Sequence, residues 1–142
     1  MARERIRETL ARYNWSGDAL RLDELAQTFC QDGELELRGS APVRGRAAIA
    51  GLLGGVVSAP NATAQESRVK RIVRHNVTNI HFTDVTSQEA HVACYFTVFT
   101  EIGLDHYGRY RDVFVPVGDD WLIRHRFVST DWSAADSTMA RR

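Results

Sequence analysis

The chain has 142 residues, of which 44% are hydrophobic and 25% are charged, a composition that can bury one hydrophobic core. Its 18 Lys and Arg residues are balanced by 18 Asp and Glu residues, so there is no bulk charge to attract nucleic acid or an anionic membrane. These numbers predict a single domain and argue against a nucleic-acid partner.

Three further features concern the compartment. The N-terminus is charged and has no secretory apolar core, and no apolar run of the sequence is long enough to span a bilayer. Cys30 and Cys94 do not have the spacing of a metal site, so we expect reduced, buried thiols rather than a disulfide. We therefore expect a cytoplasmic protein without membrane contact.

Helical spacing dominates the N-terminal half of the chain. Ile6, Leu10 and Tyr13 share one helix face, and a second apolar stripe starts at Leu22 and stops near residue 32. Residues 34–38 alternate as a half-buried strand does. The spacing predicts helices over about residues 3–14, 22–32 and 46–57, and an exposed loop over residues 58–67.

After the predicted loop, apolar residues recur at every second position, which is the spacing of a strand. Strands are expected over about residues 69–82, 90–101, 108–115 and 121–130, joined by short polar turns as an antiparallel meander. Helices segregated from strands indicate an α+β fold, in which a curved sheet wrapped on helices leaves a cavity. Both faces of the 90–101 strand are apolar, which predicts a homo-oligomer that covers one of them. After Trp132 the pattern stops, so residues 133–142 are expected to form a flexible tail.

The candidate chemistry lies where the first helix pattern gives way to the second. Alternation within its strand places His75 with Val73 and Val77 on an apolar face, so its imidazole should point inward. Asp18 alone would be a helix cap, but beside a strand histidine it becomes the carboxylate of a general base. The pattern also allows a buried His75 that is satisfied by a backbone carbonyl, and a Tyr13 that is a plain core aromatic.

Other chemistries have weaker support. The histidines lack the short, repeated spacing of a zinc or iron site, so no metal is expected: His75, His81, His91, His106 and His125. Gly51, Gly54 and Gly55 fall inside a helix pattern and do not form a phosphate loop. A serine nucleophile elbow is absent from the sequence as well. We therefore expect no cofactor.

An ordered set of short motifs resembles a known family. The set comprises Tyr13 five positions before Asp18, Leu22-Asp-Glu-Leu-Ala-Gln-Thr-Phe29, Asp32-Gly33, Gly45-Arg46-Ala-Ala-Ile49, His75-Asn-Val-Thr-Asn79, Gly108-Arg-Tyr110, Trp121-Leu-Ile and Arg126-Phe-Val. It resembles the SnoaL-like branch of the nuclear transport factor two-like superfamily over about residues 3–132. The resemblance implies a single domain over residues 1–132, a cone-shaped α+β barrel. In it, three N-terminal helices pack on a strongly curved, mainly antiparallel sheet around a deep, mostly apolar pocket.

The resemblance also implies a site. Lyase members pair an Asp at the position of Asp18 with a His at the position of His75, and the bile acid dehydratase has a Tyr matching Tyr13. These three are the expected catalytic residues of a cofactor-independent lyase or isomerase, dehydratase-like, that acts on an apolar cyclic small molecule. The residues expected to bind substrate are Trp15, Phe29, Tyr95 and Tyr110.

Two other functions stay open because the superfamily supports many of them. One is a non-catalytic small subunit of an aromatic-ring-hydroxylating dioxygenase, which requires a large partner that carries the iron centres. The other is a small-molecule binding protein in which the Asp and His are incidental. The resemblance allows a dimer or a trimer of the chain.

Overall fold

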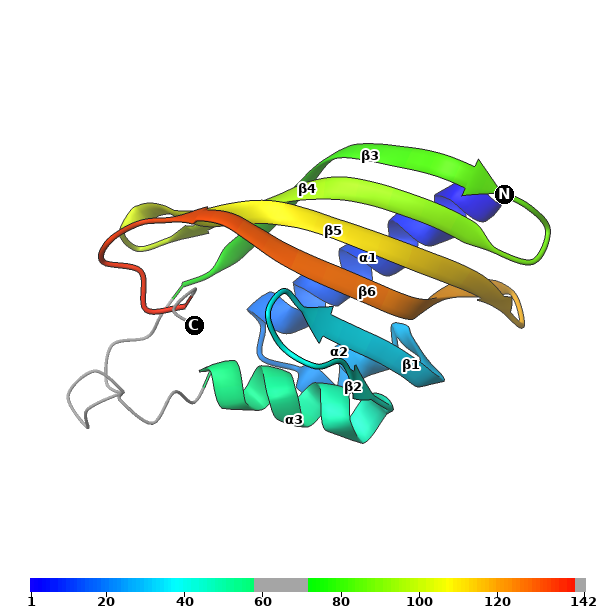
Figure 1. Ribbon diagram of the computed structural model, residues 1–142, viewed down its shortest axis with the longest axis horizontal. Helices are drawn as coiled ribbons and strands as arrows, with labels where there is room; N and C mark the ends of the chain where they lie inside the picture. The colour runs from blue at the N-terminus through cyan, green and yellow to red at the C-terminus, as the bar shows by residue number, and fades with distance from the viewer. Residues whose placement is uncertain (58–71, 140–142) are drawn as a thin grey trace.

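The computed structural model describes residues 1–57 and 72–139, which form three helices and a six-stranded sheet (Figure 1). The helices are α1 (Ala2–Asp18), α2 (Leu22–Ala26) and α3 (Arg46–Val57). The strands are β1 (Phe29–Leu37), β2 (Val43–Arg44), β3 (Arg74–Val85), β4 (Ala90–Thr100), β5 (Gly103–Val117) and β6 (Asp120–Ser133).

The sheet is mixed and mostly antiparallel, in the order β2-β1-β6-β5-β4-β3. β3 to β6 form the expected antiparallel meander, whereas β1 runs parallel to β6. α1 crosses one face of the sheet and contacts both β3 and β6, which two strands separate, so the sheet curves around this helix (Figure 1). We call the helix-covered side the inner face and the opposite side the outer face. This is the predicted α+β architecture of three helices on a curved sheet.

Inner-face residues of the sheet and the buried sides of the helices share one core. On β4 the residues at every second position are buried: Ala90, Val92, Cys94, Phe96 and Val98. On α1 the predicted face of Ile6, Leu10 and Tyr13 packs into the same core. Both cysteines are buried as free thiols, and burial raises the pKa of the Cys94 thiol to about 12.

The predicted boundaries differ from the structure most at the second helix. It ends at Ala26 instead of near residue 32, and Phe29 already pairs with Ile123 of β6. The backbone N–H and the hydroxyl of Thr28 both donate to the carbonyl of Leu25, which closes the last turn. The guanidinium of Arg46 donates two hydrogen bonds to the carbonyl of Phe29. That carbonyl therefore has side-chain partners instead of helical ones.

Other boundaries follow the expectation more closely. α3 covers the predicted residues, and α1 extends four residues beyond the predicted end at residue 14. Gly17 lies inside this extension, where an added Cβ would meet Leu25 of α2 at 3.0 Å. The first meander strand starts at Arg74 rather than at residue 69; the predicted loop over 58–67 lies outside the described residues.

The segment after β6 is partly packed against the domain. Ser133 still belongs to β6, and Ser137 is buried where its hydroxyl donates to Asp105. The flexibility expected for residues 133–142 stays a prediction, and residues 140–142 lie outside the described part. Across residues 1–57 and 72–139, no helix has the length and apolar character that crossing a membrane requires.

Candidate active site

Asp18 and His75 meet although they lie 57 positions apart in the sequence. The Asp18 Oδ1 atom lies 2.6 Å from His75 Nδ1, and Asp18 Oδ2 accepts the backbone N–H of His75 at 2.9 Å. Asp18 is the last residue of α1, and His75 is the second residue of β3, where it pairs with Val98 on the inner face. The carboxylate therefore fixes both the ring and the backbone of His75.

A sharp turn after α1 gives Asp18 its position. The backbone N–H of Leu20 donates to the carbonyl of Gly17, and that of Arg21 donates to Ser16, the pairing of a Schellman motif. Leu20 occupies the left-handed position of this motif, with φ of 60°, where glycine is usual. The chain thus leaves the helix directly after Asp18.

The geometry rules out two alternative contacts that the sequence had left open for Asp18 and His75. Asp18 does not cap the second helix, because α2 follows Arg21 and no side chain caps it. His75 Nδ1 faces a carboxylate oxygen rather than a backbone carbonyl. With the proton of the neutral ring on Nδ1, the lone pair lies on Nε2, and the carboxylate would stabilise the imidazolium. The side chains of His75 and Asp18 remain 21% and 15% exposed, so the pair is partly accessible.

Tyr13 lies deeper, in an aromatic cluster. Its ring centroid is 6.1 Å from that of Phe29 and 6.0 Å from that of Tyr110, and all three rings are buried. Burial raises the pKa of Tyr13, and it raises the pKa of Tyr110 as well, although the nearby Arg126 opposes both shifts. The phenol of Tyr13 is therefore neutral, a form that can donate a hydrogen bond.

An ion pair that the sequence did not reveal lies beside this cluster. Arg126 of β6 binds Asp112 of β5 through two hydrogen bonds of 2.8 Å, and neither side chain is exposed. The Arg126 Cζ atom is 4.2 Å from the Tyr13 ring centroid and 3.8 Å from that of Tyr110. Burial raises the pKa of Asp112 while the guanidinium opposes this shift. Inward charges on two neighbouring strands were the only sequence signal for this pair.

Two of the expected substrate-binding residues lie elsewhere. Trp15 is 77% exposed on α1, and Tyr95 is 52% exposed on the outer face of β4. In the isolated chain neither lies in the interior, whereas Phe29 and Tyr110 are buried there. Binding of substrate by any of these four residues stays a prediction. Both strand faces of β4 are apolar, and the pattern alone could not tell which one turns inward.

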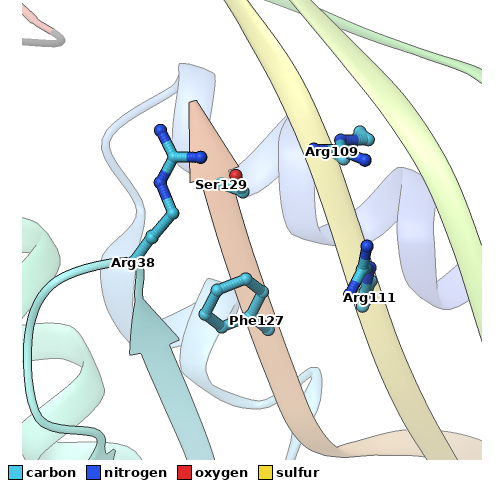
Figure 2. A pocket seen from close by; sticks show the side chains of 5 residues that line it. All are labelled: Arg38, Arg109, Arg111, Phe127 and Ser129. Carbon is cyan, nitrogen blue, oxygen red and sulfur yellow. The ribbon is translucent and has the colours of Figure 1, made fainter. Parts of the chain in front are cut away.

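Two hollows that open to solvent lie on the outer face. Five residues line one of about 200 Å³, shown in Figure 2: Arg38, Arg109, Arg111, Phe127 and Ser129. The other, of about 360 Å³, includes Tyr95 and Tyr107. Tyr13, Asp18 and His75 line neither hollow. Within the described residues no group of three His, Cys, Asp or Glu side chains could hold a metal ion.

The sequence also matches a family model. The model of the SnoaL-like domain aligns with residues 1–127. The chain belongs to the SnoaL-like domain family. No curated protein matches the sequence significantly.

Solved structures share the fold of this SnoaL-like chain. A proposed scytalone dehydratase from Novosphingobium aromaticivorans is 22% identical with a TM-score of 0.74, over 92% of this chain and 85% of that one. An NTF2-like protein with a cystatin-like fold from the same organism is 25% identical with a TM-score of 0.72, over 99% and 90%. A Catenulispora acidiphila protein in complex with S-DNPA is 25% identical with a TM-score of 0.73, over 90% and 92%.

Proposed function

We propose that this SnoaL-like protein is a cofactor-independent lyase or isomerase, dehydratase-like, that acts on an apolar cyclic small molecule. The observation that carries the proposal is the hydrogen bond of 2.6 Å between Asp18 and His75 Nδ1. Membership of the SnoaL-like family and the fold shared with a proposed scytalone dehydratase support it. The relative in complex with S-DNPA supports a small-molecule ligand.

The chemistry starts with removal of a proton from a substrate carbon. His75 Nε2 takes this proton, and the C–H electron pair forms a double bond or a conjugated enolate. Asp18 keeps the proton of the neutral ring on Nδ1 and stabilises the imidazolium that forms. Tyr13 provides a neutral phenol that can donate to a substrate carbonyl or to a departing hydroxyl.

The electrostatics favour Asp18 as a functional rather than a structural residue. A carboxylate at the C-terminal end of a helix faces the negative end of the helix dipole, which costs about 0.3–1 kcal/mol. Its two oxygens both bind His75, so the interaction that offsets this cost is the one that orients the imidazole. Residues kept against local stability are characteristic of functional sites.

A model compound that reports removal of a proton from carbon can test the proposed base without knowledge of the natural substrate. 5-Nitrobenzisoxazole loses the proton on its C3 atom to a base, its N–O bond breaks, and the product is a coloured cyanophenolate. We expect the wild type to catalyse this elimination and His75→Ala to lower kcat/KM by at least about 10²-fold. Equal rates for both proteins would contradict the proposal and favour a binding protein or a non-catalytic subunit.

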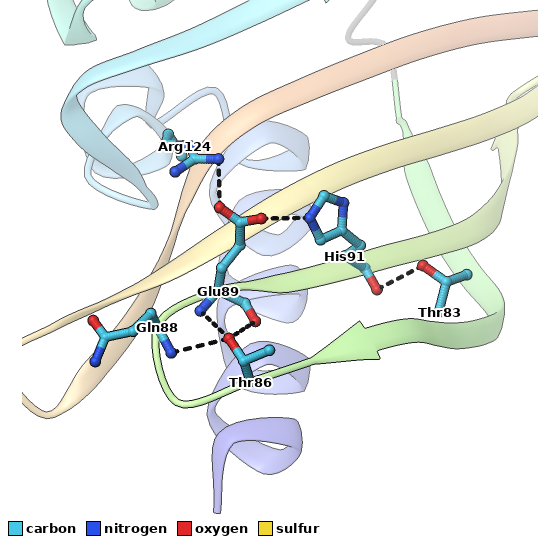
Figure 3. Close-up of polar contacts among 6 residues, drawn as sticks. All are labelled: Thr83, Thr86, Gln88, Glu89, His91 and Arg124. Atoms are coloured by element: carbon cyan, nitrogen blue, oxygen red, sulfur yellow. Dashed lines mark hydrogen bonds and ion pairs between the residues drawn. The ribbon is translucent and has the colours of Figure 1, made fainter.

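The chain offers a matched control for this experiment. His91 Nε2 also lies 2.6 Å from a carboxylate, that of Glu89, but on the outer face at the start of β4 (Figure 3). Arg124 binds the other oxygen of Glu89 at 2.7 Å (Figure 3). His91→Ala should leave the elimination rate unchanged, because the Glu89–His91 pair lies on the outer face and does not reach a substrate bound in the interior.

A further inference from the structure

The smaller hollow on the outer face gathers three arginines around one phenylalanine and one serine. Arg38 follows β1 on one side of β6, and Arg109 and Arg111 belong to β5 on the other side (Figure 2). Phe127 and Ser129 of β6 lie between them, because Arg111 pairs with Phe127 and Arg109 pairs with Ser129. None of these five lining residues is acidic, so the hollow of about 200 Å³ is positively charged.

Most of this positive charge is not neutralised by the protein. Asp131 contacts Arg109 at 3.3 Å, a long ion pair that leaves Arg109 Nε without a hydrogen-bond partner. The Nη2 atom of Arg38 donates to the carbonyl of Thr130 at 3.0 Å, which positions the guanidinium and leaves its charge. Arg111 is exposed and has neither a hydrogen bond nor an ion pair among residues 1–57 and 72–139. Three guanidiniums with one carboxylate leave two uncompensated positive charges.

The neighbouring acid of β1 does not serve this hollow. Glu36 pairs with Phe127 in register, but its Oε1 atom lies 3.0 Å from His125 Nε2. Arg109 and Arg111 are two positions apart on one strand, so they share a face at a spacing of about 7 Å and their charges repel. An anion bound between them would remove this repulsion.

Ser129 contributes a hydroxyl at the floor of the hollow. The residue is 5% exposed, and it lines the hollow. Its hydroxyl makes no hydrogen bond within the described part of the chain and can therefore donate to a ligand. Guanidiniums have donors and no acceptor, and their planar fork matches the oxygens of a phosphate or a carboxylate. The polar groups of the hollow thus form a donor set for an oxyanion.

We propose that this hollow binds the phosphate group of a small phosphate monoester whose flat, apolar body packs on the ring of Phe127. Two uncompensated charges favour a phosphate, which carries nearly two negative charges and three acceptor oxygens at neutral pH, over a carboxylate with one charge. Phe127 is partly buried and supplies an aromatic wall. The site lies on the opposite face of the sheet from His75, so it does not rest on the proposed function.

A second copy of the chain suits this hollow less well than a small anion. A two-fold interface uses the same surface of both copies. An interface centred on the hollow would bring two sets of guanidiniums together, and like charges across an interface are unfavourable. Self-association through the aromatic side chains of Tyr107 and Trp132 is compatible with the proposal, because neither residue lines this hollow.

Calorimetric titration of the full chain with four probes tests the site. We expect phenyl phosphate to bind more tightly than inorganic phosphate, benzoate to bind more weakly than phenyl phosphate, and the neutral benzamide not to bind. Arg111→Gln should raise the Kd of phenyl phosphate by at least about 10-fold, and Ser129→Ala should raise it by about 3-fold or more. Phe127→Leu should weaken phenyl phosphate and leave inorganic phosphate unchanged, because it removes the aromatic wall alone.

Arg124 is the matched control. It is an exposed arginine of β6 that binds Glu89 at 2.7 Å and lies outside the hollow. Arg124→Gln removes the same charge from the chain as Arg111→Gln does, and it should leave the Kd within about 2-fold of the wild type. His75→Ala should also bind phenyl phosphate as the wild type does, which separates the hollow from the candidate active site.

Each contrary result overturns the proposal. Equal losses for Arg111→Gln and Arg124→Gln would reveal attraction to net charge alone, and a loss with His75→Ala would place the probe in the candidate active site. If no probe binds the wild type, the site is absent; a change of molar mass for Arg111→Gln in light scattering would then assign the hollow to a second copy. If circular dichroism shows that Arg111→Gln is unfolded, Arg38→Gln replaces it and must show the same loss.

Discussion

Arg126 and Asp112 form a bidentate ion pair with hydrogen bonds of 2.8 Å, and neither side chain exposes any surface. Two charges taken out of water lose their hydration, and their attraction repays that loss only while both are present. The Arg126 Nη1 atom has no hydrogen-bond partner among the described residues, so the pair and the flanking rings of Tyr13 and Tyr110 provide most of its compensation.

Breaking this pair should be costly, and replacing it should not. Asp112→Leu leaves an uncompensated guanidinium and should lower the free energy of unfolding by about 3–5 kcal/mol. Adding Arg126→Met should restore most of the loss, because a buried ion pair is often no more stable than apolar residues of similar size. Urea unfolding of the two variants measures this, with Glu4→Gln as the control.

The control breaks a solvent-exposed pair of the same length. Arg7 and Glu4 lie 2.8 Å apart with exposed side chains, so Glu4→Gln should change the free energy of unfolding by less than about 0.5 kcal/mol. If the double variant were as unstable as Asp112→Leu alone, the uncompensated charge would not be the cause. The packing around Arg126 would then have to account for the loss.

The turn that follows α1 should gain stability from a glycine. Leu20 has φ of 60° and is 60% exposed, so its side chain adds strain and little burial. Leu20→Gly should raise the free energy of unfolding by about 0.5–1 kcal/mol. This gain is the strain that a Cβ causes in the left-handed conformation, reduced by the extra backbone entropy that glycine loses on folding. Leu20→Ala keeps the Cβ and should give no gain. A glycine variant less stable than the wild type in urea unfolding would show that Leu20 makes contacts worth more than the strain.

Periodicity predicted the parts of the fold in which one face is clearly apolar. β4 was expected over residues 90–101 and covers Ala90–Thr100, and α3 has the expected bounds. The second helix was wrong because the apolar spacing from Leu22 to Phe29 fits either a continued helix or a short helix followed by a buried strand. Tertiary pairing of Phe29 with β6 decides between them, and spacing does not contain that information.

The candidate site was also predicted only in part. Asp18 and His75 were paired through the family resemblance, since no local pattern links residues on different elements. The ion pair of Arg126 and Asp112 was missed because isolated charges are usually assigned to solvent. His106 was considered only as a metal ligand, and its hydrogen bond to the adjacent Asp105 was not expected, because successive residues of a regular strand point to opposite faces.

The outer face should mediate self-association. Tyr95, Phe99, Tyr107 and Trp132 form an exposed aromatic patch there, each 39–52% exposed, and Tyr107 stacks on Trp132 at 5.6 Å. A contiguous exposed patch of this kind marks an interaction surface. We expect light scattering to show a dimer or trimer of the wild type at micromolar concentration and a smaller species for Phe99→Lys. Thr83→Lys, on the exposed end of β3, should not change the mass; a monomeric wild type would contradict the expectation.

Asp18→Asn should separate activity from stability. The amide can accept the His75 N–H with its oxygen and donate to Nδ1, which moves the ring proton to Nε2 and removes the base. With 5-nitrobenzisoxazole we expect kcat/KM to fall by roughly 10²- to 10⁴-fold. The free energy of unfolding should be kept or rise by up to about 1 kcal/mol, because the variant removes a negative charge from the C-terminal end of α1.

Asp23 is the control for Asp18, because its carboxylate lies at the N-terminal rather than the C-terminal end of a helix. It lies in the first turn of α2, where a carboxylate is favoured by the helix dipole, and it is exposed. Asp23→Asn should therefore lose a few tenths of a kcal/mol and no activity. If Asp18→Asn instead lost stability and kept its elimination rate, Asp18 would be a structural tie between α1 and β3. His75 would then not depend on it as a base.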